Sequence, residues 1–123
     1  MGRGDHKKLK EGEAALNRWF GKYKRRAQKN NIEFSLSKEE FQNLIIQDCT
    51  YCGDPPVERC TSESCINGTI KANGLDRSDN KLGYTTTNAI PCCSVCNRFK
   101  LDYTKEEFLN HMKRISENHP CTL

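Results

Sequence analysis

The sequence is poor in apolar residues and has no long hydrophobic run. Only 35% of its 123 residues belong to the AVILMFWYC set, with one Trp and two Met. No segment approaches the roughly 20 consecutive apolar residues of a membrane-spanning helix, so we expect no membrane partner. The beginning, MGRGDHKKLK, lacks the apolar stretch of a secretory signal peptide. We therefore expect an intracellular protein in a reducing compartment, the cytoplasm or a host cell cytoplasm.

The same shortage limits the size of the hydrophobic core. A chain of this length is typical of one domain, and its low apolar content leaves few side chains for a core. We therefore exclude a large-cored multidomain enzyme. We also expect some further link, covalent or metal-mediated, to add to the stability of the fold.

Cysteine is the residue type that could supply this link. The chain has eight Cys. Their share of the sequence lies below the roughly 8–10% that is typical of disulfide scaffolds. Cys49 with Cys52, and Cys93 with Cys96, form two C-x-x-C pairs. Four thiolates from two such pairs make a tetrahedral structural zinc site; the alternative is a disulfide or free thiols. Cys92 and Cys121 are given no role. Cys60 and Cys65 could form a disulfide or do nothing, and we expect them to do nothing.

Positive charge is concentrated in the N-terminal part of the chain. Residues 1–48 hold 11 Lys and Arg against 7 Asp and Glu, whereas residues 49–123 hold 9 against 9. The segment Lys7–Lys29 has a loose 3.6-residue apolar pattern and predicts an amphipathic helix. Its basic end suits contacts with nucleic-acid phosphates; the alternative is a solvated face that complements the helix dipole. The candidate contacts are Lys22, Lys24, Arg25, Arg26 and Lys29.

Two capping boxes predict further helices. Ser37 and Thr104 are each followed three residues later by Glu, the arrangement that satisfies the first amides of a helix. They predict one helix that ends near Asp48 and another that ends near Asn118. In the last helix, the apolar stripe is expected to close over the cysteine pairs as core; it comprises Phe108, Leu109, Met112 and Ile115.

The middle of the chain predicts short strands. Residues 57–73 show no periodicity and predict a loop or a poor hairpin. Residues 74–77 and 88–91 predict two strands, the second of which ends at Pro91. Residues 94–100 predict a short helix, so one cysteine pair precedes this strand–loop–strand–helix unit and the other lies at the start of its helix.

The same region contains a pattern that resembles a known family. The pattern is Cys49-x2-Cys52-Gly53, Leu75-Asp76-Arg77, Gly83-Tyr84, Asn88, Cys93-x2-Cys96-Asn97 and Lys100. It resembles the HNH endonucleases of the ββα-metal superfamily, in particular their small phage- and virus-type branch, over residues 49–115. The resemblance implies an α+β fold, a small zinc-stabilised ββα-metal module with N-terminal helices and a C-terminal helix. We divide the chain into a basic helical arm, residues 1–48, and the four-cysteine module with its C-terminal helix, residues 49–123.

The resemblance also implies roles for individual residues. Asp76 and Asn97 fall on ligands of the catalytic divalent ion, Mg²⁺ or Mn²⁺, and Asn88 falls on the Asn that fixes the loop geometry. The alternatives are a loop cap or a salt bridge to Arg77 for Asp76, and a brace of the second cysteine pair for Asn97. The structural Zn²⁺ ligands are Cys49, Cys52, Cys93 and Cys96.

Arg77 departs from the family pattern, which has a His at this position as the base that activates water. Arginine keeps its proton near neutral pH and cannot serve as that base. A general base contributes roughly 10²–10⁴-fold to a rate, so its loss leaves a slow enzyme or none. Another group could replace it; the candidates are Tyr84, Asp79 and His111.

Two functions therefore remain open. The first is a divalent-metal-dependent DNA endonuclease, in which Arg77 stabilises developing charge. The second is a non-catalytic module that binds nucleic acid or supports assembly in a larger nucleoprotein or virion complex, with Arg77, Arg98 and Lys100 on phosphates. DNA is the expected partner ahead of RNA. A zinc-stabilised protein-interaction module with no affinity for nucleic acid is a third alternative.

Overall fold

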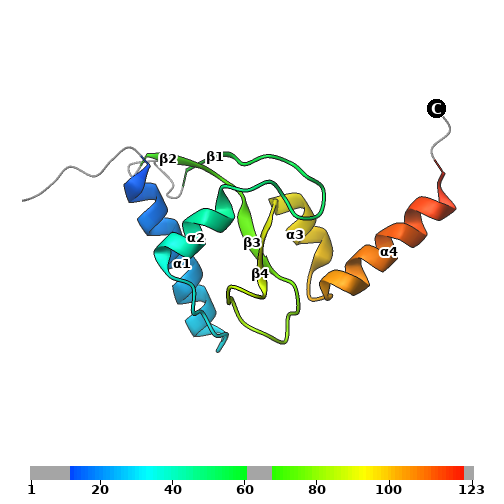
Figure 1. Ribbon diagram of the computed structural model, residues 1–123, viewed down its shortest axis with the longest axis horizontal. Coiled ribbons are helices and arrows are strands. Elements are labelled where there is room, and N and C mark those ends of the chain that lie inside the picture. Colours follow the sequence, from blue (N-terminus) through cyan, green and yellow to red (C-terminus); the bar gives the residue numbers. More distant parts are fainter. Residues whose placement is uncertain (1–11, 61–67, 121–123) are drawn as a thin grey trace, which may run out of the picture.

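The computed structural model describes residues 12–60 and 68–120 of the chain. In Figure 1, α1 and α2 lie on one side of the β3–β4 hairpin and α3 lies on the other, while α4 extends away from the body. The α+β fold class is therefore confirmed. The elements, in order, are α1 (Glu13–Lys29), α2 (Lys38–Ile45), β1 (Val57–Cys60), β2 (Thr69–Ala72), β3 (Gly74–Arg77), β4 (Ala89–Cys92), α3 (Ser94–Lys100) and α4 (Lys105–Asn118).

Both predicted capping boxes are present. The Ser37 hydroxyl accepts a hydrogen bond from the Glu40 amide at 3.1 Å, and the Glu40 carboxylate accepts one from the Ser37 amide at 2.8 Å. Thr104 and Glu107 form the same reciprocal pair at the start of α4. Helix α1 ends before Asn31, whose φ of 57° lies in the left-handed region. Residues 7–11 of the predicted first helix lie outside the described residues. None of the described helices combines the length and apolar character that a membrane crossing requires.

The described strands pair as two separate antiparallel hairpins. β1 pairs with β2, with Val57 opposite Ala72, so the hairpin and not the loop is correct for this region. β3 pairs with β4, with Asp76 opposite Ile90. Strand β4 continues to Cys92, one residue beyond the end predicted at Pro91. Proline is tolerated inside β4 because the outer edge of a two-stranded hairpin needs no further ladder bond.

One hydrophobic core joins the N-terminal helices to the β3–β4 hairpin. The rings of Phe20 and Tyr23 on α1 pack edge-on against Phe41 of α2, with each centroid 5.4 Å from that of Phe41. The Tyr23 hydroxyl accepts a hydrogen bond from the Leu75 amide of β3 at 3.0 Å. Helix α1 therefore has a fixed position relative to β3. The buried members of this core are Leu16, Leu36, Phe41, Ile45, Ala72, Leu75 and Ala89.

The loop between β3 and β4 is held against the segment that follows α1. The Tyr84 amide donates to the Glu33 carbonyl at 2.8 Å, and the Ser35 amide donates to the Tyr84 carbonyl at 3.1 Å. A Cβ on Gly83 would lie only 2.5 Å from the Glu33 carbonyl oxygen. This close approach of two backbones requires glycine at position 83.

Helix α4 contradicts the prediction that its apolar stripe is core. Phe108 is 6% exposed and packs against Tyr51, with the ring centroids 5.1 Å apart. Leu109, Met112 and Ile115 are 42%, 37% and 46% exposed. The physical reason is that α4 packs on the body through Phe108 in its first turn and then projects outward (Figure 1), so its later turns stay largely exposed.

Candidate metal centre and nucleic-acid interface

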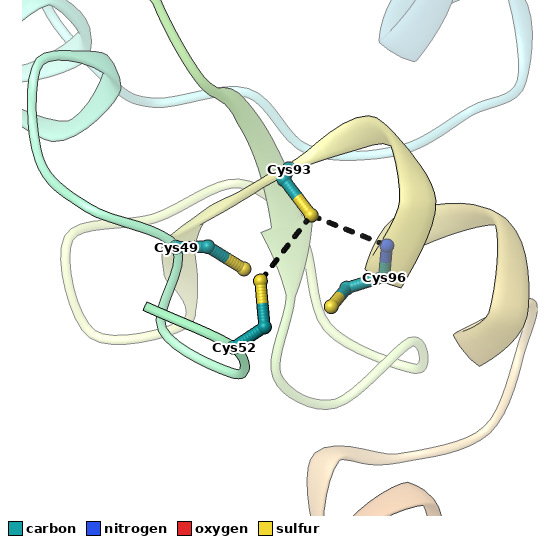
Figure 2. Close-up of side chains that lie close together, drawn as sticks. All are labelled: Cys49, Cys52, Cys93 and Cys96. Atoms are coloured by element: carbon teal, nitrogen blue, oxygen red, sulfur yellow. Dashed lines mark hydrogen bonds between the residues drawn. The ribbon is translucent and has the colours of Figure 1, made fainter. Parts of the chain in front are cut away.

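The two C-x-x-C pairs converge on one point. Cys49 and Cys52 come from the turn after α2, and Cys93 and Cys96 come from the start of α3 (Figure 2). All four sulfur atoms lie within 4.8 Å of one another, and those of Cys52 and Cys93 are 3.7 Å apart. A tetrahedral zinc ion with Zn–S bonds of about 2.3 Å places its sulfur ligands about 3.8 Å apart. The four thiols are therefore close enough to hold one metal ion of this kind.

Local backbone structure explains why the sulfur atoms point inward. In the first pair, the Gly53 amide donates to the Cys49 carbonyl at 2.9 Å, and Gly53 has a φ of 81° that closes the turn. In the second pair, Cys93 is the N-cap of α3 and its sulfur accepts a hydrogen bond from the Cys96 amide at 3.4 Å. The Thr50 amide donates to the Pro91 carbonyl at 2.9 Å and joins the first turn to β4.

The backbone around the cluster favours a thiolate at Cys49. Burial acts to raise the pKa of Cys49, but hydrogen bonds from the backbone amides of Cys52, Cys93 and Tyr51 outweigh it and lower this pKa to about 6. Burial raises the pKa of Cys96, and hydrogen bonding to neighbouring cysteines adds to that increase. One preformed thiolate among four thiols is a suitable starting point for a cation, since thiolate is the form that binds metal.

Two of the other cysteines lie in the described part of the chain, and neither belongs to this cluster. Cys92 is fully buried and its thiol donates to the Cys93 carbonyl at 3.3 Å. Cys60 is disulfide-bonded, so the expectation that it does nothing is wrong. Cys65 and Cys121 lie outside the described residues.

Asp76 lies on β3 in the interior and both of its carboxylate oxygens have partners. Its side chain is 6% exposed. The Tyr51 hydroxyl donates to Oδ2 at 2.7 Å, and the Lys100 ammonium lies 3.3 Å from Oδ1 and 3.2 Å from Oδ2. The salt bridge of Asp76 is therefore with Lys100 and not with Arg77.

Lys100 is not available for the phosphate contact that the sequence suggested. Its side chain is 0% exposed, and besides Asp76 its ammonium donates to the Arg77 carbonyl at 3.0 Å and to Asn80 Oδ1 at 3.1 Å. An ammonium that is buried and hydrogen-bonded in this way cannot reach a ligand at the surface. Lys100 is therefore a structural residue in this arrangement, and we exclude it from the nucleic-acid contacts.

Arg77 faces the opposite side of the hairpin from Asp76, because successive residues of a strand point to opposite faces. Its guanidinium donates to the carbonyls of Asn80 and Leu82 at 2.7 and 3.1 Å, and lies over the Tyr84 ring at 5.6 Å from the centroid. Asp76 and Arg77 are therefore adjacent in sequence but do not face a common site.

Asn88 holds the β3–β4 loop in shape, the role that the resemblance implies for it. Its side chain is buried; the amide nitrogen donates to the carbonyls of Asp79 and Gly83 at 3.0 and 2.9 Å. Its side-chain oxygen accepts from the Asp79 amide at 2.9 Å. All of these bonds are internal to the loop, so Asn88 acts on its geometry and does not face a ligand.

The resemblance also implies a catalytic divalent ion, and the residues present do not fit it in this arrangement. Asn97 lies on an exposed side of α3, one turn before Lys100. Within residues 12–60 and 68–120, no hydrogen bond joins the Asn97 side chain to Asp76, and the Asp76 oxygens are already paired with Tyr51 and Lys100. The ammonium of Lys100 lies against both carboxylate oxygens, where a metal ion on Asp76 would have to bind.

In the described chain, none of the other candidate bases is hydrogen-bonded to Asp76. Tyr84 packs between Tyr23 and Phe34, with centroid distances of 6.0 and 5.7 Å, and burial raises its pKa. The Asp79 carboxylate accepts from the Lys81 amide at 2.9 Å. His111 is exposed on the projecting helix α4.

The basic residues of α1 form an exposed group near the hairpin loop. All five predicted contacts on α1 are exposed. Arg98 is also exposed, but it lies on α3, on the other side of the hairpin. A cavity of about 180 Å³ separates the end of α1 from the hairpin, and Arg26 and Arg77 both line it. Its polar lining also includes Tyr23, Asn30 and Tyr84. The three-dimensional fold thus brings Arg77 to the basic helix, which the sequence alone did not indicate.

Sequence reasoning missed two residues that complete the interior. Tyr51 stands between the first two cysteines and connects that turn to Asp76 through its hydroxyl. Asn80 accepts from Lys100 and donates to the Leu101 carbonyl at 3.2 Å. The Asp–Asn sequence at 79–80 and the Tyr inside a cysteine pair were visible signals, but only the folded chain brings Asn80 to the Lys100 ammonium and Tyr51 to Asp76.

These features define a class of fold: a ββα unit made of β3, β4 and α3, framed by two cysteine pairs. The structure of the rare-cutting HNH restriction endonuclease PacI has the same fold, with a TM-score of 0.58 and 22% sequence identity over 86% of this chain and 78% of that one. The predicted resemblance to the HNH fold is therefore confirmed.

Sequence comparison places relatives of the chain in a virus and a phage. The chain is 38% identical over 84 residues to an uncharacterized protein of Acanthamoeba polyphaga mimivirus. The aligned segment covers 68% of this chain and 14% of that protein. The chain is 31% identical over 86 residues to an uncharacterized protein of Enterobacteria phage T4, covering 70% of this chain and 30% of that protein. The chain thus spans less than a third of either relative. No protein-family model matches it.

Proposed function

We propose that this chain is a zinc-stabilised HNH-fold module that binds DNA through the basic side of α1. The observation that carries the proposal is the shared cavity of Arg26 and Arg77 beside the exposed basic end of that helix. Two guanidinium groups around one cavity suit a phosphodiester, since arginine donates paired hydrogen bonds to phosphate oxygens. DNA is preferred to RNA because the structural neighbour is a DNA restriction endonuclease.

The zinc ion is part of the same proposal. Cys49, Cys52, Cys93 and Cys96 have the donor type, number and spacing of a structural zinc site. Zinc would fasten the start of α3 to the turn after α2 and so stabilise the frame around the hairpin. Thiolate ligands persist where thiols stay reduced, so the proposed compartment is the cytoplasm of the cell or of a host cell, although the disulfide of Cys60 is unusual for such a compartment.

The length of the relatives supports a role within something larger. The matched segments are a small part of the virus and phage proteins. We therefore expect the module to be the DNA-binding part of a larger polypeptide, or of a nucleoprotein or virion assembly. Its exposed basic helix and compact frame fit such an accessory role, because neither requires an intact catalytic centre.

Fluorescence anisotropy with a labelled duplex tests the DNA-binding proposal. We expect binding at about 50 mM salt that weakens steeply as salt rises, because each neutralised phosphate releases counterions. The double variant Arg25→Ala/Arg26→Ala should lose at least tenfold in affinity, about 1.4 kcal/mol. Lys113→Ala, which removes one exposed positive charge on α4, is the matched control and should bind as the unchanged chain does. Absence of binding at low salt, or equal binding by the double variant, contradicts the proposal.

Metal-dependent hydrolysis of DNA is the second candidate, favoured by the fold shared with a restriction endonuclease. In that reading Asp76 and Asn97 hold Mg²⁺ or Mn²⁺, Asn88 braces the loop and Arg77 contacts the phosphate from the α1 side. The pairing of Asp76 with Lys100, and arginine instead of histidine at position 77, weigh against it.

A plasmid-nicking assay with Mg²⁺ or Mn²⁺ separates the two candidates. Cleavage that disappears in both Asp76→Ala and Asn97→Ala supports the enzyme. DNA binding without cleavage supports the binding module. Lys113→Ala again serves as the control for loss of a surface charge.

A further inference from the structure

Lys100 is a fully buried cation enclosed by oxygen atoms. Its ammonium lies 3.0 Å from the Arg77 carbonyl, 3.1 Å from Asn80 Oδ1, and 3.3 and 3.2 Å from the two oxygens of Asp76. These oxygens comprise a carboxylate, a side-chain amide and a backbone carbonyl. They are also the ligand types that hard divalent cations take from proteins.

The burial shows that this arrangement is specific. A charged ammonium is costly to remove from water unless it is paired and its donors are satisfied. The ammonium has three donors and Lys100 has three residues to accept them, one of which, Asp76, supplies the compensating negative charge. The enclosure is therefore complete in both hydrogen bonding and charge.

The same oxygens are held in place from three directions. Asp76 is fixed by the Tyr51 hydroxyl at 2.7 Å, and Asn80 by the Leu101 carbonyl at 3.2 Å. The Arg77 carbonyl belongs to β3, in the ladder with Ala89. An oxygen cage fixed in this way would persist if the cation inside it were exchanged.

We propose that the Lys100 ammonium is a built-in cation that takes the place of a divalent ion between β3 and α3. The zinc-loaded chain then binds no divalent ion at Asp76. Removing the ammonium creates a weak divalent-cation site from Asp76, Asn80 and the Arg77 carbonyl. The inference does not depend on DNA binding, because it concerns metal uptake by the chain alone.

Titration of Mn²⁺ into the zinc-loaded protein, followed by electron paramagnetic resonance, tests the proposal. The unchanged chain should leave Mn²⁺ free at concentrations up to about 1 mM, the weak end of oxygen-ligand sites. Lys100→Met, which keeps an unbranched side chain one atom shorter and removes its charge, should bind one Mn²⁺ with a Kd of about 10⁻⁴–10⁻³ M, the range of weak Ca²⁺ modules. The double variant Lys100→Met/Asp76→Asn should lose that site.

Lys81→Met is the matched control, because Lys81 is exposed in the loop that carries Asn80. It should bind no Mn²⁺, as the unchanged chain does. A folded Lys100→Met variant with full zinc content and no Mn²⁺ binding overturns the proposal.

If Lys100→Met does not fold, a measurement on the unchanged chain tests the proposal instead. Paramagnetic broadening of the amide signals of residues 76–80 by Mn²⁺, abolished in Asp76→Asn, would show a divalent ion at Asp76 and overturn the proposal. Absence of that broadening supports it. Neither result bears on DNA affinity, so failure of this inference is distinguishable from failure of the proposed function.

Discussion

The two ends of helix α3 are suited to cations of different kinds. At its start, Cys93 and Cys96 join two further thiols in a cluster with room for an external ion. At its end, Lys100 brings its own positive charge to Asp76 and two further oxygens. One short helix thus has four thiols that could hold a metal ion at one end and a covalently attached cation at the other.

The difference follows from ligand chemistry. Soft thiolates select zinc and similar ions. Carboxylate and carbonyl oxygens accept hydrogen bonds from an ammonium as readily as they bind a hard cation. Loss of the first kind of cation is reversible in solution, whereas loss of the second requires a change of sequence.

Removing the metal from the cysteine end should have the largest effect. Structural zinc contributes apparent binding energies of about 10–16 kcal/mol in small zinc domains, comparable to the whole stability of a typical domain, about 5–15 kcal/mol. We expect Cys96→Ser, or treatment with a strong chelator, to abolish zinc binding and to unfold the chain. Metal content and circular dichroism during thermal unfolding measure both effects.

Cys92→Ala is the matched control for this prediction. Cys92 is buried beside the cluster but its sulfur is not one of the four. We expect full zinc content and a loss of about 0.5–3 kcal/mol in the free energy of unfolding, the usual range for a single substitution. Zinc-free protein that keeps its fold would contradict the proposed metal frame.

Removing the cation from the other end should cost less. Lys100→Met leaves Asp76 buried without its ion-pair partner, a change that typically costs about 3–5 kcal/mol. The double variant Lys100→Met/Asp76→Asn should recover part of that loss, because the unpaired charge is then gone. Urea unfolding of the zinc-loaded proteins measures the free energy of unfolding of each variant. A Lys100→Met variant as stable as the unchanged chain would show that the pair is not buried.

Tyr51→Phe should have a smaller effect, because it removes only the hydrogen bond between the turn of the first cysteine pair and Asp76. The Tyr51 hydroxyl donates to Asp76, while its ring packs against Phe108 and would remain. A hydrogen bond to a charged group contributes about 1.5–3 kcal/mol. We expect a loss of that size in urea unfolding with unchanged zinc content. Tyr103→Phe, on an exposed tyrosine, is the control and should be neutral.

Ile115→Gln on the projecting helix should have the smallest effect. Ile115 is 46% exposed and lies far along α4 from its only buried residue, Phe108. Surface changes of this kind usually stay within about ±0.5 kcal/mol. A loss of more than about 2 kcal/mol in thermal unfolding would instead indicate that the apolar stripe packs as core, the expectation that the structure contradicts.

The local features of the fold were predictable, whereas the direction of several side chains was not. Capping boxes at Ser37 and Thr104 are patterns within four residues, so sequence alone identified both helix starts. The cysteine pairs were identified by spacing, and the structure brings their sulfur atoms together. The prediction that the apolar stripe of α4 is core was wrong, because periodicity indicates which face is apolar but not whether another element covers it.

The sequence by itself determined the cysteine spacing, the basic helix and the ββα order, because each depends on residue types at short separations. Tertiary structure alone decided that Lys100 enters the interior and that Arg77 turns toward Arg26 on α1. The physical reason is that a charged side chain stays in water unless the fold supplies partners. Those partners, Asp76 and Asn80 for Lys100, come together only when β3, its loop and α3 pack against one another.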